Sequence, residues 1–255
     1  MSFSFFAKTL CAATLLGICV SVYAESFDEL IAKGDVFDVK LNASEALEYY
    51  LPAEKLQPSN ARVLIRIARQ YRHLMADAAT REEKLRLGGI ALEYGQRAAA
   101  LAPNDSDAQL STAISYGKML PLMGVKEQIE ASRHIKEKAD MAIRLNPNND
   151  LAWHVLGRWH RVLSDVSLLK RSMASLAYGG LPQTTTEEAV KCFEKAIEIN
   201  PNRLIHYIEL GRAYAQMKRV AEARRFIEKG LAMPDVEKDD PDTKRRGRET
   251  LAKLH

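Results

Sequence analysis

The chain has 255 residues, of which 47% are hydrophobic and 27% are charged, and its formal net charge is +4. This length allows one or two domains with a sizeable core, and the composition excludes disorder over most of the chain. The small positive charge does not by itself indicate a nucleic-acid-binding protein, while the abundance of Ala, Leu, Glu, Lys and Arg favours helix.

The first 24 residues predict a secretory signal peptide. Lys8 is their only charged residue before Glu25, an apolar stretch spans residues 9–22, and a small residue, Ala24, stands where signal peptidase would cleave. The stretch is short for a membrane span, which needs about 20 residues. We therefore expect an exported protein, periplasmic or secreted, and the alternative is a membrane anchor formed by the uncleaved segment. Cleavage would leave Cys192 as the only cysteine, so no internal disulfide is expected.

Four prolines recur along the sequence in the same local context and predict a helical repeat. Each follows an apolar residue and one further residue, and each precedes Asn, Asp or Ser; they are Pro58, Pro103, Pro147 and Pro201. Proline ends the preceding helix because it lacks an N–H and clashes with the turn before it. The Asn and Asp residues that follow are suited to cap the next helix.

Fixed sets of residues flank each of these prolines. Before each proline, at fixed distances, stand three residues that are mostly small, and in two of the four sets the middle residue is large. The sets are Ala46, Tyr50 and Ala53; Ala91, Gly95 and Ala98; Ile135, Ala139 and Ala142; Ala189, Phe193 and Ala196. After them stand Leu64, Ile67, Ala68 and Tyr71; Gln109, Thr112, Ala113 and Tyr116; Trp153, Leu156, Gly157 and His160; Tyr207, Leu210, Gly211 and Tyr214. These sets resemble the second and first helices of the tetratricopeptide (TPR) repeat, whose first helix carries W-x2-L-G-x2-Y.

The phased repeats predict an all-α, TPR-like right-handed helical solenoid of about five helix-pair repeats over residues 25–234. The three middle repeats carry insertions, which we place near residues 76–87, 120–132 and 164–185. Residues 235–255 predict a polar linker and a C-terminal capping helix that begins with Asp240 as N-cap and Pro241 at the first helical position. A polar terminal helix would cover the open end of the solenoid.

One part of the chain resembles a more specific family. The matching motifs lie at residues 153–159, 178–182, 184–189, 210–214 and 231–234. They resemble the regulator of microtubule dynamics (RMD) family of TPR-like proteins, specifically over residues 151–234 and more loosely from residue 27. The resemblance implies a helical-repeat fold without catalysis; family members are linked to microtubules, and a membrane-tethered member is linked to lipid transfer at organelle contacts. A secretory signal would place this chain where tubulin is absent, so we expect a bacterial-type relative and no tubulin partner.

The side chains that carry catalysis or bind metals show no recognisable arrangement. None of the six His residues forms a pair with metal-ligand spacing, and Cys192 lacks a recognisable His, Asn or Asp partner. The glycine pairs are not phosphate-binding loops, and no nucleophile elbow occurs. Trp153 occupies a core position of the repeat. The repeat pattern does not fix the position of Trp159, which could face the third insertion. The sequence therefore predicts no enzyme, no cofactor and no metal site.

Arginine recurs at one position of the first helices, which line the concave groove of a TPR solenoid. The candidate ligand-binding residues are Arg69, Arg158 and Arg212 at that position, Arg72 and Arg161 one turn away, and Arg62 on the same helix face as Arg69. Arginine pairs well with carboxylate and phosphate, so a basic groove for an acidic peptide, a lipid head group or an anionic polymer is one interpretation. The other is a solvated charged face in which some Arg pair with Glu from second helices.

The function expected from the sequence is that of a non-enzymatic scaffold that binds a partner protein or an acidic peptide in this basic groove, and not nucleic acid. The alternative is a lipid or small-molecule carrier whose cavity lies beneath the insertions, beside Trp159, Tyr178 and Leu181. An enzyme or enzyme subunit is disfavoured because no acid–base pair or nucleophile constellation supports it.

Overall fold

The computed structural model describes residues 25–167 and 180–254, and all regular secondary structure within them is helical. The predicted signal peptide lies outside the described residues and stays a prediction. The elements are α1 (Phe27–Val39), α2 (Ala43–Leu56), α3 (Ala61–Asp77), α4 (Arg81–Leu101), α5 (Ser106–Met119), the 3-10 turn η1 (Leu120–Leu122), α6 (Val125–Leu145), α7 (Asp150–Ser164), α9 (Thr186–Ile199), α10 (Leu204–Gln216), α11 (Val220–Ala232) and α12 (Asp240–Leu251). The predicted all-α class is confirmed.

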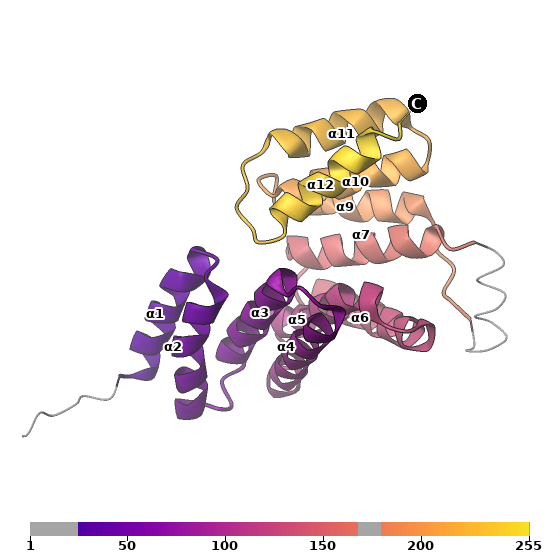
Figure 1. Cartoon of the computed structure of the whole chain (residues 1–255). Coiled ribbons are helices and arrows are strands. Elements are labelled where there is room, and N and C mark those ends of the chain that lie inside the picture. Colours follow the sequence, from indigo (N-terminus) through magenta and orange to yellow (C-terminus); the bar gives the residue numbers. More distant parts are fainter. Residues whose placement is uncertain (1–24, 168–179, 255) are drawn as a thin grey trace, which may run out of the picture.

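Consecutive helices pack as pairs, and the pairs stack into a curved array (Figure 1). The pairs are α1–α2, α3–α4, α5–α6, α7–α9 and α10–α11. The first helices of neighbouring pairs also touch, because α3 contacts α5, α5 contacts α7 and α7 contacts α10. This is the five-unit helical solenoid that the repeats predict, in which each unit packs on its neighbours in sequence.

The four repeat prolines mark helix ends as predicted. α2, α4, α6 and α9 end at Leu56, Leu101, Leu145 and Ile199, each two residues before its proline. Asn60, Asp105 and Asn149 then cap α3, α5 and α7 with side-chain hydrogen bonds to backbone N–H groups. The fourth unit differs, because the N-cap of α10 is Arg203, which makes no capping hydrogen bond with its side chain.

The glycines of the repeat pattern let paired helices approach closely. A Cβ atom at Gly157 would lie 2.8 Å from the Phe193 ring of α9. A Cβ atom at Gly211 would lie 2.8 Å from the carbonyl oxygen of Ala223 in α11. Phe193 is completely buried, and so is Tyr50, which fills the equivalent place in the first pair. The core therefore runs between the two helices of each pair.

Two of the three insertions lengthen helices instead of forming loops. α4 and α6 each have 21 residues, and α3 is joined to α4 by residues 78–80 alone. Thr80 accepts a hydrogen bond from the N–H of Glu83 and starts α4 early. The third insertion, near residues 164–185, falls partly outside the described residues.

The C-terminal helix α12 lies on α10 and α11 (Figure 1). Its start differs by one residue from the prediction, because the N-cap is Asp239 and Asp240 is the first helical residue. The Asp240 carboxylate instead accepts hydrogen bonds from the N–H groups of Val236 and Glu237, at 2.8 and 2.7 Å. Gly247 packs against the Ile208 and Ile227 side chains, so α12 covers the end of the core as expected.

Among residues 25–167 and 180–254, none of the helices combines the length and the apolar character that crossing a bilayer requires.

Candidate functional site: the groove lined by the first helices

We call the surface of the first helices that carries Arg69, Lys118, Arg158 and Arg161 the groove. The three candidate arginines of α3 reach different neighbours. Arg62 is exposed and lies beside a small pocket between α1 and α3. Arg69 forms ion pairs with Asp38 of α1, at 3.5 Å, and with Glu237 of the C-terminal linker, at 3.4 Å. Arg72 is buried against α5. Sharing a helix face therefore does not bring the three side chains to one site.

Arg72 is a buried cation without a carboxylate partner among the described residues. Its Nη1 donates hydrogen bonds to the hydroxyl oxygens of Ser111 and Ser115, at 3.1 and 3.2 Å. Burial lowers the pKa of Arg72 to about 10, and the nearby charge of Arg69 acts in the same direction. Arg72 thus joins α3 to α5 from inside the fold, and an external ligand would have to open that contact to reach it.

Arg161 and Arg212 converge on one buried carboxylate. Glu209 of α10 has an exposed side-chain fraction of 1% and lies 3.1 Å from Arg161 Nε and 2.6 Å from Arg212 Nη1. Arg246 of α12 approaches the same carboxylate at 3.8 Å. Burial by itself would raise the pKa of Glu209, but the surrounding guanidinium groups hold it well below its usual range. This cluster joins α7, α10 and α12.

The acid that holds this cluster comes from a first helix, not from a second helix as the alternative interpretation of the sequence supposed. Glu209 precedes Arg212 by one turn of α10, so an i,i+3 pair was visible in the sequence. Its pairing with Arg161 and Arg246 depends on the packing of α10 against α7 and α12 and could not be seen there.

Arg158 differs from the other groove cations. Its side chain is half-buried, and within the described part of the chain it makes no hydrogen bond and has no carboxylate within 4 Å. It is close enough to Lys118, Arg161 and Arg246 for its charge to disfavour their protonated forms. Its charge also favours the ionised carboxylates of Glu209 and Asp239, which compensate it from a distance without pairing with it. The guanidinium donors of Arg158 therefore stay unused by the described residues and offer a place for an anion.

The linker between α11 and α12 supplies acids that the sequence analysis did not connect with the groove. Glu237 contacts Arg69 and also Arg203, whose Nη1 lies 3.2 Å from the carboxylate. Asp239 pairs with Lys118 of α5 at 2.6 Å. The acidic character of residues 235–242 was visible in the sequence, but its return to the groove depends on long-range packing.

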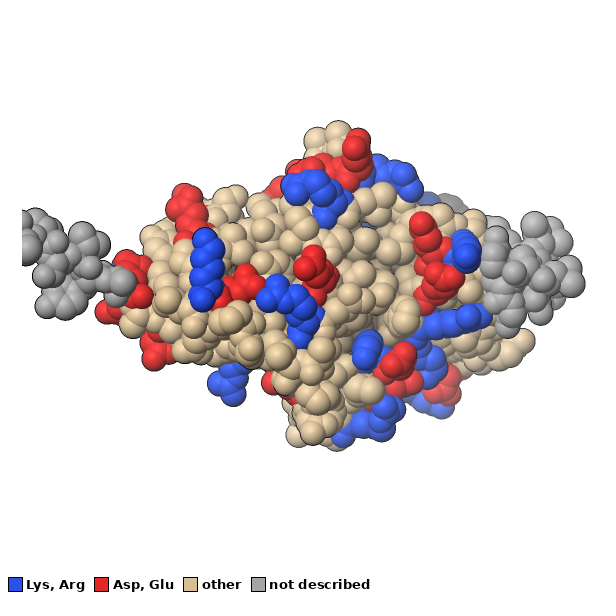
Figure 2. Space-filling model, turned by 90° about the horizontal axis from the view of Figure 1, so that it is seen from below, with Lys and Arg blue, Asp and Glu red and all other residues tan. Residues whose placement is uncertain are grey.

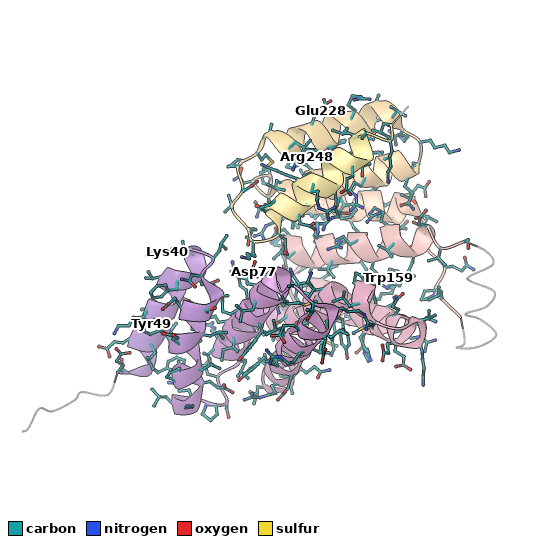
Figure 3. All side chains as sticks on the ribbon, viewed as in Figure 1. Lys40, Tyr49, Asp77, Trp159, Glu228 and Arg248 are labelled. Atoms are coloured by element: carbon teal, nitrogen blue, oxygen red, sulfur yellow. The ribbon has the colours of Figure 1, made fainter. Side chains whose placement is uncertain are left out.

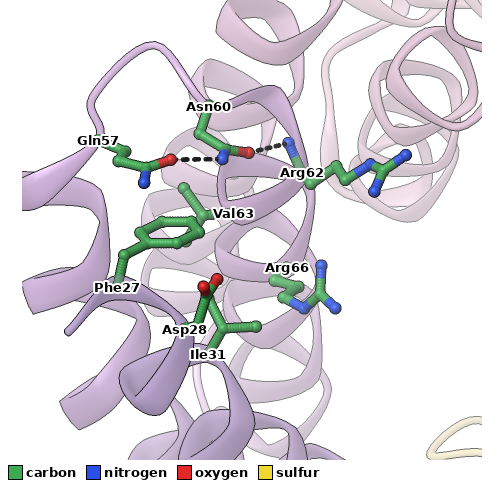
Figure 4. Close-up of a pocket in the computed structure, with 8 residues that line it drawn as sticks. All are labelled: Phe27, Asp28, Ile31, Gln57, Asn60, Arg62, Val63 and Arg66. Atoms are coloured by element: carbon green, nitrogen blue, oxygen red, sulfur yellow. Dashed lines mark hydrogen bonds between the residues drawn. The ribbon is translucent and has the colours of Figure 1, made fainter.

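The pocket beside Arg62 has a volume of about 350 Å³ (Figure 4). Phe27 and Ile31 of α1 and Val63 of α3 form its apolar wall, and Arg66 stands at its edge. Arg66 is already paired with Asp35, at 2.7 Å between Nε and Oδ1. A second pocket, of about 460 Å³, lies between α1 and α2 beside Tyr49 and Pro52. Both pockets lie at the N-terminal end and neither lies beneath an insertion.

The aromatic side chain proposed to line a carrier cavity belongs to the core. Trp159 is 5% exposed, and its Nε1–H donates to the carbonyl and hydroxyl oxygens of Ser132 in α6. Leu181 packs against the hydrophobic core cluster that contains Trp159, while Tyr178 lies outside the described residues. Trp153 is half-buried and donates from Nε1 to the Pro147 carbonyl oxygen at 2.8 Å. Both indoles are therefore engaged within the fold.

A buried chain of titratable groups joins α7 to α10. Asp150 Oδ2 lies 2.9 Å from Nε2 of His206, and the two Nδ1 atoms of His206 and His154 are 3.1 Å apart. Since a neutral imidazole carries one N–H, His206 donates to the carboxylate from Nε2 and accepts at Nδ1 from His154. Burial lowers the pKa of both imidazoles, which keeps them neutral. Both rings are buried, so they cannot contact a substrate.

Other reactive side chains in the described residues have structural surroundings. Burial raises the pKa of the Cys192 thiol to about 12, so its reactive thiolate is scarce near neutral pH. Within residues 25–167 and 180–254, no group of three or more His, Cys, Asp or Glu side chains is placed to hold a metal ion. On the face of the molecule in Figure 2, acidic and basic side chains are interspersed, without a large patch of one sign.

The chain is similar to one named family over most of its length. The sequence profile described as Regulator of microtubule dynamics protein 1-3 matches residues 25–255. Regulator of microtubule dynamics protein 2 of Mus musculus is 26% identical over 231 residues, which are 89% of this chain and 56% of that protein. Regulator of microtubule dynamics protein 1 of Mus musculus is 27% identical over 215 residues, which are 84% of this chain and 70% of that protein. The chain thus spans about half the length of the protein 2 relatives.

Solved structures of TPR proteins share the fold. A thermophilic TPR protein of Thermus thermophilus superposes with a TM-score of 0.65 at 17% identity, covering 89% of this chain and all of that one. The pilF protein of Pseudomonas aeruginosa gives a TM-score of 0.54 at 15% identity, covering 89% of this chain and 88% of that one. The fold is therefore TPR-like, and the profile match over residues 25–255 shows that the chain belongs to the regulator of microtubule dynamics 1–3 family.

Proposed function

We propose that this chain is a non-enzymatic scaffold that binds a partner protein through an acidic peptide segment of the partner, which lies in the groove formed by the first helices. The observation that carries this proposal is Arg158, the half-buried groove cation without a carboxylate within 4 Å among the described residues. Its neighbours Lys118, Arg161 and Arg246 have carboxylate partners already.

A carboxylate placed at Arg158 would lower the electrostatic energy of Arg158 and of the cations near it. The guanidinium group offers a planar set of donors that matches both carboxylate oxygens. The added negative charge would also offset the repulsion between Arg158 and Lys118, Arg161 and Arg246. A partial withdrawal from water strengthens such an interaction relative to an exposed surface pair.

A peptide fits these observations better than a lipid. The two pockets described above lie at the N-terminal end, away from the insertions that would roof a lipid cavity. Trp159, which was expected to border a carrier cavity, is packed against α6. The names of the relatives refer to microtubule dynamics, but the predicted signal peptide would export this chain, so we propose an acidic partner other than tubulin.

The test compares the full chain with Arg158→Gln and with the control Arg144→Gln. Arg144 is an exposed arginine of the second helix α6 without an ion pair to a described residue, so both variants remove one positive charge. The probe is a fluorescein-labelled oligoglutamate peptide, measured by fluorescence anisotropy at low and physiological salt. Vesicles of phosphatidylglycerol in phosphatidylcholine provide a second probe.

We expect the peptide to bind the wild type and the control equally. Arg158→Gln should bind it at least about tenfold more weakly, because a hydrogen bond to a charged group contributes about 1.5–3 kcal/mol. Equal affinity of all three proteins for the peptide would overturn the assignment of Arg158. Binding to the anionic vesicles without binding to the peptide would favour the carrier function over the scaffold.

A further inference from the structure

The linker that enters α12 returns to the groove instead of leaving the solenoid. In Figure 1 it descends from α11 toward the C-terminal end of α3 before α12 begins. Figure 3 marks Asp77 at that end of α3, and Lys238 of the linker pairs with Asp77 at 2.8 Å. Residues 235–240, which we call the acidic segment, therefore bridge repeats that are far apart in the sequence.

Glu237 of the acidic segment lies between cations of two distant repeats. One carboxylate oxygen is 3.4 Å from Arg69 Nη2 of α3, and the other is 3.2 Å from Arg203 Nη1 at the start of α10. Arg69 is one of the residues predicted from the sequence to bind an acidic ligand. One of its two carboxylate partners, beside Asp38, is thus a side chain that lies 168 positions further along the same chain.

Asp239 occupies the groove two residues further on. Both of its carboxylate oxygens accept hydrogen bonds from Lys118 Nζ, at 2.7 and 2.6 Å. Burial would raise the pKa of Asp239, but the Lys118 ammonium lowers it below its usual value, so the carboxylate is charged. Arg158 lies near enough to act on the same carboxylate by its charge, although the two side chains form no ion pair.

The shape of the acidic segment is held by its own residues. The buried Asp240 carboxylate accepts hydrogen bonds from the N–H groups of Val236 and Glu237. Lys244 of α12 pairs with Asp235 at 2.6 Å and donates to the Met233 carbonyl oxygen. These contacts present Glu237 and Asp239 to the groove as a preformed pair, which reduces the entropy lost on docking.

We propose that the acidic segment is an autoinhibitory occupant of the groove, and that the partner is an acidic peptide with carboxylates two residues apart that displaces it. This inference rests on the proposed function, because it names the ligand class and the regulation of the same groove. Glu237 and Asp239 lie in a turn, in which the Asp240 N–H donates to the Glu237 carbonyl oxygen, and they show where two carboxylates of a peptide in a similar turn would meet Arg69 and Lys118.

The contacts of the acidic segment are suited to release. The side chains of Arg69 and Glu237 are 41% and 31% exposed, and those of Lys118 and Asp239 are 22% and 47% exposed. Ion pairs with such exposure are weak and screened by salt, so each favours the closed form by a factor of up to about five. The segment competes mainly because it is tethered, which gives it a high effective concentration at the groove. A free peptide can gain the additional contact with Arg158 that the segment does not make.

The test uses the full chain and two double variants of equal charge. Glu237→Gln/Asp239→Asn removes the two carboxylates that reach the groove. Glu222→Gln/Glu249→Gln removes two glutamates from the same C-terminal region, where they pair locally with Arg219 and Arg245. The probe is a fluorescein-labelled synthetic peptide that copies residues 233–242, measured by anisotropy. Hydrogen exchange of the amides at residues 236–240 reports whether the segment leaves the groove when unlabelled peptide is added.

We expect Glu237→Gln/Asp239→Asn to bind the peptide about tenfold more tightly than the wild type, while the control binds like the wild type. Adding peptide to the wild type should speed amide exchange at residues 236–240. If all three proteins bind with the same affinity and Arg158→Gln weakens binding, the autoinhibition is overturned and the proposed function stands. If none of them binds this peptide or oligoglutamate, both the autoinhibition and the proposed function are overturned.

Discussion

The substitution Glu209→Gln would test whether the C-terminal half of the groove depends on one buried carboxylate. Glutamine has nearly the same shape, so the change removes a charge without creating a cavity. Arg246 keeps its ion pair with Asp242, and Arg212 is 20% exposed and can be solvated in part. Arg161 is 14% exposed and has Glu209 as its carboxylate partner, so it would become a nearly buried charge without compensation.

Removing one partner of a buried pair costs about 3–5 kcal/mol, and the partial exposure of Arg212 and Arg246 places this case near 3 kcal/mol. For a chain of this size that loss lowers the melting temperature by about 6–12 °C. Thermal and urea unfolding followed by circular dichroism would measure it. The control is Glu228→Gln, an exposed glutamate of α11 that Figure 3 marks, which should change the unfolding free energy by less than about 0.5 kcal/mol.

The double variant Glu209→Gln/Arg161→Met separates a charge effect from a packing effect. If the unpaired Arg161 causes the loss, replacing it by an apolar side chain of similar length should restore part of the stability. A Glu209→Gln variant that unfolds within about 0.5 kcal/mol of the wild type would refute the view that this carboxylate anchors α7, α10 and α12.

Two further predictions concern helix packing and pH. Gly211→Ala should lower the unfolding free energy, measured by urea denaturation, by about 1–3 kcal/mol, because the new Cβ would lie 2.8 and 2.9 Å from backbone atoms of α11. Gly89→Ala should instead raise it by about 0.5–1 kcal/mol, because no atom lies within 4 Å of the new Cβ. Burial lowers the pKa of His73 to about 3, and the charges of Arg69 and Lys118 act in the same direction. The unfolded chain, in which the pKa is about 6.5, therefore binds a proton more readily than the folded protein does. The contribution of His73 to stability is complete above pH 6.5 and is lost as the pH falls from 6.5 toward 3. Between pH 7 and pH 5 the loss should be about 2 kcal/mol, and His73→Gln should remove it from the pH dependence; an unchanged dependence would contradict the assignment.

The repeat architecture could be predicted because its determinants are local. Pro58 and its three equivalents end helices by their own chemistry, and Gly157 is spaced so that Phe193 can fill the gap it leaves. The extra residues near 76–87 and 120–132 were located from the repeat spacing, which did not determine whether they are helical; in the structure they lengthen α4 and α6. The signal was present for α4, since Thr80 stands three residues before Glu83 and is followed by strong helix formers.

Which groove arginines form ion pairs could not be predicted, because most of the pairing carboxylates are distant from them in the sequence. Arginine periodicity correctly placed Arg69, Arg158 and Arg212 on first helices. The periodicity carried no information on whether a carboxylate side chain lies opposite each arginine. Glu237 reaches Arg69 across 168 positions, whereas Arg158 has no carboxylate within 4 Å in the described residues. Whether these side chains bind a ligand stays a prediction, but the structure distinguishes an arginine with an ion pair from one without.

The acidic segment has a mechanical consequence that follows from the solenoid itself. In such a fold each repeat contacts its neighbours, so the curvature of the array depends on many small interfaces in series. Glu237 adds a direct connection between α3 and the start of α10, and Asp239 adds one to α5. Both connections are partly exposed ion pairs, so each resists a change in the separation of these distant repeats only weakly. A peptide that displaces them would therefore need only modest differential affinity to release the curvature of the array as well as to occupy the groove.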